Sequence, residues 1–293
     1  MNKLIILSLG FKGFYSIKSL DKSLYESIEF VVVGRDKNVL NDYSNELIEL
    51  CQNAGIKCIE KKDFDIKKVK SHYAVALGWR WIFSVTEKLQ LIVLHDSLLP
   101  KYRGFNPLVT ALINGDEMVG ATAILASKDY DKGAIIFQEK IKVKYPAKIS
   151  NVINELAKLY SEFLFKIVHN IKFSIDFNFF EQDESEATYS LWRDELDYFI
   201  DWNKDSELIL RHIHASGFPY EGAKTHLNEK KLTVLDAQIE EDIKIINRAP
   251  GKILRIVDGK PTVVCGRGLI KILDLRDSNN DLVFLKTLRQ RFH

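Results

Sequence analysis

Residues 91–104 read Leu-Ile-Val-Leu-His-Asp-Ser-Leu-Leu-Pro-Lys-Tyr-Arg-Gly, and this stretch predicts a strand that runs into a polar loop. Its first four residues are apolar and have the length of a short buried strand. The proline and the glycine that follow indicate that the chain then turns away. His95 therefore lies at the carboxyl end of a strand, which is the edge where open α/β sheets bind ligands.

A second polar loop occupies residues 128–133, which read Lys-Asp-Tyr-Asp-Lys-Gly. It separates the apolar run 121–125 from the strand-like residues 134–137. A histidine and a carboxylate offered from two such loops can form an acid/base pair, here His95 and Asp131. Each residue also has a plainer interpretation, because a buried histidine can be satisfied by a backbone carbonyl and a turn carboxylate is usually exposed.

Strands alternate with helices around this stretch, and the alternation decides the fold class. The expected strands are residues 4–9, 30–34, 56–59 and 73–77, and the expected helices are residues 14–20, 43–54, 107–113 and 150–171. Such alternation predicts an α/β fold with a doubly wound, mostly parallel, Rossmann-like sheet. A hairpin signal at Asp258-Gly259, flanked by residues 253–257 and 262–265, predicts a β-rich second part.

Length and composition bound the domain organisation and the class of partner. The chain has 293 residues, 46% of them hydrophobic, which is enough for two domains. We expect a catalytic domain over residues 1–180 and, over 181–293, linker helices followed by a small β-rich domain. Forty-two basic and 40 acidic residues nearly cancel, so no strong field argues for nucleic acid or for a membrane.

The cysteines and the N-terminus favour a cytoplasmic protein. Cys51, Cys58 and Cys265 are odd in number and lack the spacing of metal ligands, so we expect packing roles and no metal. The apolar run at residues 4–7 is short and has no small-residue cleavage site after it. It is therefore interpreted as a first strand and not as a signal peptide.

The two polar loops also carry a family resemblance. The block 95–104, with Asn-Gly-Asp at 114–116, Gly-Ala-Thr at 120–122 and Asp-Lys-Gly-Ala-Ile-Ile at 131–136, resembles the core of formyltransferases that use 10-formyltetrahydrofolate. Members of that family act on methionyl-tRNA, glycinamide ribonucleotide or amino-sugar nucleotides. The resemblance implies that His95 and Asp131 are catalytic and that 10-formyltetrahydrofolate is the co-substrate.

The resemblance extends, more diffusely, into the second half of the chain. Pro-Tyr-Glu-Gly-Ala at residues 219–223 resembles a family pattern that precedes a small β-barrel-like domain of the OB type. The family resemblance also implies which residues in the first half of the chain bind ligands. Those expected for folate are Gly78, Trp79, Arg80, Trp81, Ile82, Phe83 and Tyr130, and those expected for a substrate phosphate are Gly10, Lys12 and Gly13. Core packing of the aromatic residues and a tight strand-to-helix turn at the glycines are the alternatives.

Val93 departs from the family pattern. The family has a third catalytic residue, an asparagine two positions before its histidine, and here that position is Val93. Alternate residues of a strand share a face, so this side chain lies beside His95. Loss of one oxyanion donor typically costs about 3–4 kcal/mol. The open outcomes are a slower enzyme, a donor supplied by a backbone amide, water, Ser97 or Asn106, and a fold that binds without reacting. Arg103 is a further candidate for substrate support.

The leading functional hypothesis is N-formylation of an amino-sugar nucleotide by a cytoplasmic enzyme. A methionyl-tRNA enzyme is expected to carry a Gln-Pro-Asp-Arg segment and a basic loop after the second strand, and residues 33–38 read Val-Gly-Arg-Asp-Lys-Asn. A methionyl-tRNA formyltransferase-like activity, hydrolysis of the formylated folate and a non-catalytic binding module are the alternatives. The sequence leaves the sugar, the nucleotide and a homodimer open.

Overall fold

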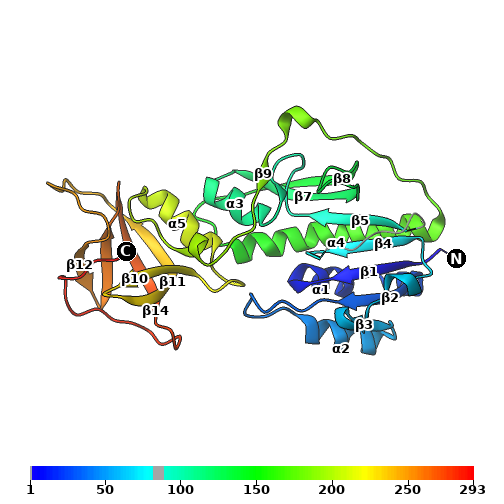
Figure 1. Ribbon diagram of the computed structural model, residues 1–293, viewed down its shortest axis with the longest axis horizontal. Coiled ribbons are helices and arrows are strands. Elements are labelled where there is room, and N and C mark those ends of the chain that lie inside the picture. The colour runs from blue at the N-terminus through cyan, green and yellow to red at the C-terminus, as the bar shows by residue number, and fades with distance from the viewer. Residues whose placement is uncertain (1, 82–88) are drawn as a thin grey trace. The chain divides into compact units, whose positions relative to one another are not determined.

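The structure, a computed structural model, describes residues 2–81 and 89–293 (Figure 1). Its contacts divide the chain into two compact units. The first contains Met1–Leu108, Met118–Lys142 and Ile153–Leu191, and the second contains Val109–Glu117, Val143–Val152 and Trp192–His293. The division at residue 180 that the sequence suggests stays a prediction.

Within the described residues of the first unit, seven strands form one sheet in the order β3-β2-β1-β4-β5-β7-β8. Their bounds are β1 Leu4–Ser8, β2 Ile28–Val33, β3 Cys58–Glu60, β4 Tyr73–Leu77, β5 Gln90–His95, β7 Met118–Leu125 and β8 Ile135–Lys142. The strands from β3 to β5 in this order are parallel, whereas β7 is antiparallel to β5 and to β8. The predicted mostly parallel α/β sheet is confirmed, and the direction of the strands reverses at β5.

Helices cover the sheet because its central strands are apolar on both faces. All five residues of β1 are buried. The helices of this first unit are α1 Gly10–Lys18, α2 Ser44–Ala54 and most of α4 Ile149–Phe173, with short 3-10 helices η1 Lys22–Ser27, η2 Lys61–Asp63, η3 Ile66–Lys68 and η4 Glu184–Glu186. Most of α3 Pro107–Asn114 belongs to the second unit. From Ile153 onward α4 lies along the sheet (Figure 1), burying Leu156, Tyr160, Phe163 and Ile167 at helical spacing. No helix within the described ranges is both long and apolar enough to cross a membrane.

The third strand begins later than the sequence suggests. We expected it over residues 56–59, and β3 covers Cys58–Glu60. The reason lies in the end of α2, where the amides of Gly55 and Ile56 bond back to the carbonyls of Gln52 and Cys51. Gly55 has φ +68, the left-handed conformation common at helix ends. The backbone is therefore still part of the helix terminus where its apolar pattern resembles a strand.

The second unit contains an antiparallel five-stranded sheet in the order β10-β11-β14-β13-β12, which confirms the predicted β-rich C-terminal domain. The strands are β10 Ala223–Leu227, β11 Lys230–Glu240, β12 Ile253–Val257, β13 Lys260–Val264 and β14 Leu269–Arg276, and they follow η5 Leu196–Tyr198 and α5 Ser206–Ala215. Apolar residues of α5 and of the strands share one core. Residues 291–293 join the two edges of this sheet, because Phe292 forms a bridge with Leu227 of β10 and Arg291 forms one with Lys252, next to β12.

His212 on α5 makes the stability of this second unit depend on pH. Burial lowers the pKa of His212 to about 4, and the charge of Arg193 acts in the same direction. The unfolded chain takes up this proton below about pH 6.5 and the folded chain does not, so stability is complete above that pH and declines toward pH 4. We expect a loss of about 2–3 kcal/mol over this range. Urea unfolding at pH 7 and pH 4.5 measures it, and an equal loss in a His212→Gln variant would contradict the assignment.

Candidate active site

The sheet places His95 where its direction reverses. His95 is the last residue of β5, lies opposite Thr122 of β7, and is 7% exposed. Val93 lies two residues earlier on the same face, between Ala76 of β4 and Ile124 of β7, and is partly exposed. Both residues lie in one continuously paired strand, in which alternate side chains share a face, as expected from the sequence.

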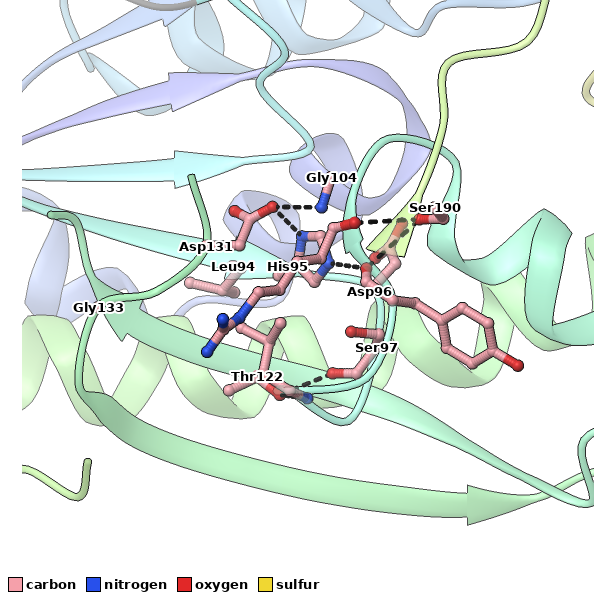
Figure 2. A network of polar contacts seen from close by, with 12 residues as sticks. Leu94, His95, Asp96, Ser97, Gly104, Thr122, Asp131, Gly133 and Ser190 are labelled. Atoms are coloured by element: carbon pink, nitrogen blue, oxygen red, sulfur yellow. Dashed lines mark hydrogen bonds and ion pairs between the residues drawn. The ribbon is translucent and has the colours of Figure 1, made fainter. Parts of the chain in front are cut away.

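Both ring nitrogens of His95 face oxygen atoms. Nε2 lies 2.9 Å from the carbonyl oxygen of Tyr102, and Nδ1 lies 3.7 Å from Oδ2 of Asp131. Figure 2 shows the ring and the carboxylate pointing toward one another, the first from the end of β5 and the second from the loop between β7 and β8. A carbonyl oxygen only accepts hydrogen bonds, so Nε2 carries the hydrogen in this contact. The structure thus brings together the two residues that the sequence singles out as an acid/base pair.

The loop that carries Asp131 has a specific backbone shape. Asp131 has φ +54, in the left-handed region that aspartate tolerates better than most residues. Its Oδ2 also accepts a 2.7 Å hydrogen bond from the amide of Gly104 (Figure 2). Gly133 allows the loop to close, because a Cβ at that position would lie 1.6 Å from the carbonyl oxygen of Leu125. The position of the Asp131 carboxylate is therefore set by the backbone of its own loop and by the amide of Gly104.

Hydrogen bonds of Ser97 stabilise the loop that follows His95, residues 96–102, which we call the histidine loop. Its hydroxyl donates to the carbonyl of Lys101 at 2.6 Å, and its own carbonyl accepts from the hydroxyl of Thr122 at 2.6 Å. The side chain of Gln138 on β8 donates to the carbonyl of Leu99 and to Thr122. These contacts give Ser97 a structural task, and its proposed role as a replacement oxyanion donor stays a prediction.

A charged cluster beside His95, mostly shielded from water, was missed by sequence reasoning. Asp96 forms an ion pair with Lys12 of α1 and accepts a 2.7 Å hydrogen bond from the hydroxyl of Tyr160 on α4. Burial raises the pKa of Asp96, but the charge and hydrogen bond of Lys12 and the bond from Tyr160 outweigh it, and the pKa lies below its usual value. Burial and the charge of Asp96 raise the pKa of Tyr160 well above its usual range.

Two of the three residues expected to bind a phosphate have other contacts. Lys12 is paired with Asp96 and lies over the ring of Tyr160. Gly13 lets α1 approach β1, because a Cβ there would lie 2.1 Å from the hydroxyl of Ser8. Gly10 begins α1 with φ +71. A phosphate at this turn remains a prediction, and it would compete with Asp96 for Lys12.

Arg103 and Asn106 lie on the segment that follows the histidine loop. Arg103 is fully buried, and its guanidinium binds Gln182 and Glu184 of the connector after α4. Hydrogen bonding to Glu184 raises the pKa of Arg103. Asn106 has φ +48 and directly precedes α3. Direct substrate support by either residue stays a prediction.

The residues expected to wall the folate pocket follow β4. Gly78 has φ +62, and Trp79 packs beside the apolar cluster around Ile5 and Leu7. The rings of Trp79 and Trp81 meet edge to face, with centroids 4.9 Å apart. Arg80 pairs with Asp36 at 2.8 Å. The remaining predicted residues are Ile82 and Phe83, which lie outside the described residues, and Tyr130, which is 63% exposed on the Asp131 loop.

The indole nitrogen of Trp79 has no hydrogen-bond partner in the part of the chain that the structure describes. This nitrogen, Nε1, is buried. Buried indole nitrogens normally find an acceptor, so this group is an exception among the described residues, and a folate contact by Trp79 stays a prediction. Across the same residues, no three His, Cys, Asp or Glu side chains are grouped so that they could hold a metal ion.

Two domain families match the chain. The formyl transferase family matches residues 62–168, and the formyl transferase C-terminal domain family matches residues 194–290. Similar curated proteins include the methionyl-tRNA formyltransferases of Pseudothermotoga lettingae, 31% identical over 68% of this chain and 64% of the relative, and of Ehrlichia chaffeensis, 30% identical over 57% and 52%. The chain thus spans between about half and two thirds of the length of these relatives.

Solved structures share the fold over nearly the whole chain. The N-formyltransferase of Helicobacter canadensis, in complex with folinic acid and dTDP-3-aminofucose, has a TM-score of 0.68 at 20% identity, over 93% of this chain and 99% of that chain. HypX of Aquifex aeolicus, in complex with tetrahydrofolic acid, has a TM-score of 0.63 at 21% identity, over 94% and 44%. At these identities the likeness concerns the fold.

Proposed function

The chain belongs to the formyl transferase family, and from this premise we propose that it transfers a formyl group from 10-formyltetrahydrofolate to the amino group of a sugar nucleotide. The observation that carries the proposal is the approach of His95 and Asp131 at the carboxyl end of β5. The sugar acceptor is favoured by the missing basic loop after β2 and by the likeness, over both chains' lengths, to an N-formyltransferase bound to a dTDP-amino sugar.

The donor supplies an activated formyl group, and the chain's own residues manage charge and protons. Attack by a neutral amine places negative charge on the formyl oxygen and leaves a surplus proton on the amine nitrogen. A protonated His95 would donate through Nε2 to the carbonyl of Tyr102, form an ion pair through Nδ1 with Asp131, and present a positive charge at the strand end. That charge is suited to stabilise the developing oxyanion.

Asp131 is the group suited to receive the proton of the amine. Its carboxylate borders the ring of His95 and is oriented by the amide of Gly104. The proton must finally reach the folate nitrogen that leaves, so the transfer as a whole consumes none. In this scheme His95 and Asp131 act as one pair, and loss of either partner removes both charge stabilisation and proton transfer.

Residues that follow β4 suit the folate. Trp79 offers an unused donor among the described residues, and Trp81 adds an aromatic face next to it. Both leave the carboxyl end of a parallel strand adjacent to β5, the edge at which such sheets bind ligands. We therefore assign this segment, together with Tyr130, to the folate side of the site.

A methionyl-tRNA acceptor is the second candidate, because the curated relatives named above are methionyl-tRNA formyltransferases. The test incubates the purified chain with 10-formyltetrahydrofolate and, separately, a panel of amino-sugar nucleotides, methionyl-tRNA, or no acceptor. We expect an N-formylated sugar nucleotide, identified by mass spectrometry. Formylated methionyl-tRNA would favour the second candidate, formate release without an acceptor would indicate a hydrolase, and folate binding without turnover would indicate a binding module.

The Val93→Asn variant tests whether another group has replaced the family's asparagine. Val93 lies between Ala76 and Ile124, so a new amide there adds polar atoms to an apolar, paired setting. We expect the amine-dependent rate at saturating substrates to stay unchanged or to fall, because a chain that keeps His95 and Asp131 has a working arrangement. A rise of about 100-fold, the size expected for a regained oxyanion donor, would show that the native chain is an impaired catalyst.

A further inference from the structure

The connector after α4 makes a complete set of hydrogen bonds with the buried guanidinium of Arg103. Its Nε and Nη2 donate to Oε1 of Gln182 at 3.1 and 2.8 Å. Nη2 and Nη1 donate to the two carboxylate oxygens of Glu184 at 2.7 and 2.9 Å, and Nη1 also reaches the hydroxyl of Tyr189 at 3.5 Å. A guanidinium has five N–H donors, so these contacts use all of them.

Gln182, which accepts hydrogen bonds from Arg103, also donates hydrogen bonds to the loop that carries Asp131. Its Nε2 donates to the backbone carbonyls of Asp131 and Gly133, at 2.7 and 2.8 Å. Its Oε1 accepts both bonds from Arg103, so one amide group uses two donors and two acceptor positions. The side chain thereby joins the strand β6 (Arg103–Gly104) to the loop that carries the proposed catalytic carboxylate.

The connector is also fastened to the histidine loop through its backbone. The strand β9 (Tyr189–Ser190) pairs in parallel with β6. The amide of Tyr102 donates to the hydroxyl of Thr188, and the amide of Arg103 donates to the carbonyl of Thr188. The carbonyl of Tyr102, which faces His95, therefore belongs to a segment that the connector holds in place.

We infer that Gln182, held by Arg103 and Glu184, is a positioning residue that sets the place of the Asp131 carboxylate against His95. This inference rests on the proposed function for its catalytic meaning. The geometric reason is that Asp131 adopts φ +54, a conformation that a non-glycine residue keeps only when its surroundings fix it. The two bonds from Gln182 flank that residue and supply the constraint.

The Gln182→Glu variant isolates this role by a change of one atom. A carboxylate keeps the acceptor for Arg103 and loses both donors to the loop, so two carbonyl oxygens then face an anion. The amide of Gly104 reports the position of Asp131 directly, since it donates to Oδ2. We expect hydrogen exchange at Gly104 to become about tenfold faster, and kcat to fall about 10- to 100-fold with little change in KM for either substrate.

Glu186→Gln is the matched control, because it makes the converse single-atom change at an exposed position on the same 3-10 turn as Glu184. It should leave Gly104 exchange and kcat as in the native chain. If Gln182→Glu fails to fold, Glu184→Gln takes its place, and it should give a smaller change of the same kind. Unchanged Gly104 exchange in a folded variant overturns the inference, even if kcat falls. If the native chain shows no formyl transfer, the proposed function fails alone, and Gly104 exchange still decides the positioning role.

Discussion

Formyl transfer by the His95→Ala variant is expected to be slower than that of the native chain by about 1,000-fold. Alanine removes both ring nitrogens, and with them the bond to the Tyr102 carbonyl and the contact with the carboxylate of Asp131. The fold should persist, because His95 is the last residue of β5 and its strand pairing is made by the backbone. Rates at saturating donor and acceptor, with circular dichroism as a check of folding, measure the effect.

Asp131→Asn gives the same test from the other partner, with an expected loss of about 100- to 1,000-fold. Asparagine tolerates the left-handed φ of this residue, and its side-chain oxygen can still accept from Gly104. The variant therefore removes the charge and basicity while keeping the loop. Asp129→Asn, an exposed carboxylate on the same loop, is the matched control and should react as the native chain does. A native-like rate in His95→Ala or in Asp131→Asn would refute the catalytic assignment.

The pair could be foreseen from the sequence because its geometry follows from local rules. The four-residue apolar run 91–94 leads directly into His95, and the strand β5 ends at that histidine. Strand alternation then places Val93 on the face of His95 without any knowledge of distant contacts. Asp131 was identified by its loop and by the family motif. The 3.7 Å distance between Nδ1 of His95 and Oδ2 of Asp131 depends on the antiparallel pairing of β7 with β5. Local sequence patterns do not determine that pairing.

Contacts that support the pair were out of reach of sequence reasoning because they join distant segments. Gln182 and Asp131 are 51 residues apart, and Gln182 lies in a connector without helical or strand periodicity. Tyr160 and Asp96 are 64 residues apart. Tyr160 is buried on α4, and the helical periodicity of that segment says nothing of what its hydroxyl binds. The same holds for Lys12, whose neighbouring glycines suggested a phosphate whereas its ammonium pairs with Asp96.

The second large effect is on stability, and it concerns the ion pair of Lys12 and Asp96. Their side chains are only 14% and 20% exposed, so removal of the cation leaves a carboxylate that is mostly shielded from water. We expect Lys12→Met to lower the free energy of unfolding at pH 7 by about 3 kcal/mol. The pKa of Asp96 lies below its usual value in the native fold, so the contribution of this group is complete above the unfolded pKa and is lost as pH falls. The difference in free energy of unfolding between the native chain and Lys12→Met should therefore become smaller at acidic pH.

Two comparisons distinguish the effect of leaving the Asp96 carboxylate without its cation from the general effect of removing a lysine. Lys158→Met removes a lysine that pairs at 2.7 Å with Glu155, both 54% exposed, and should cost less than about 0.5 kcal/mol. The double variant Lys12→Met with Asp96→Asn removes both charges and keeps an acceptor for Tyr160, so it should be more stable than Lys12→Met alone. Urea unfolding of the four proteins decides the matter. A double variant less stable than Lys12→Met would mean that contacts other than Lys12 stabilise the Asp96 carboxylate, and it would contradict this explanation.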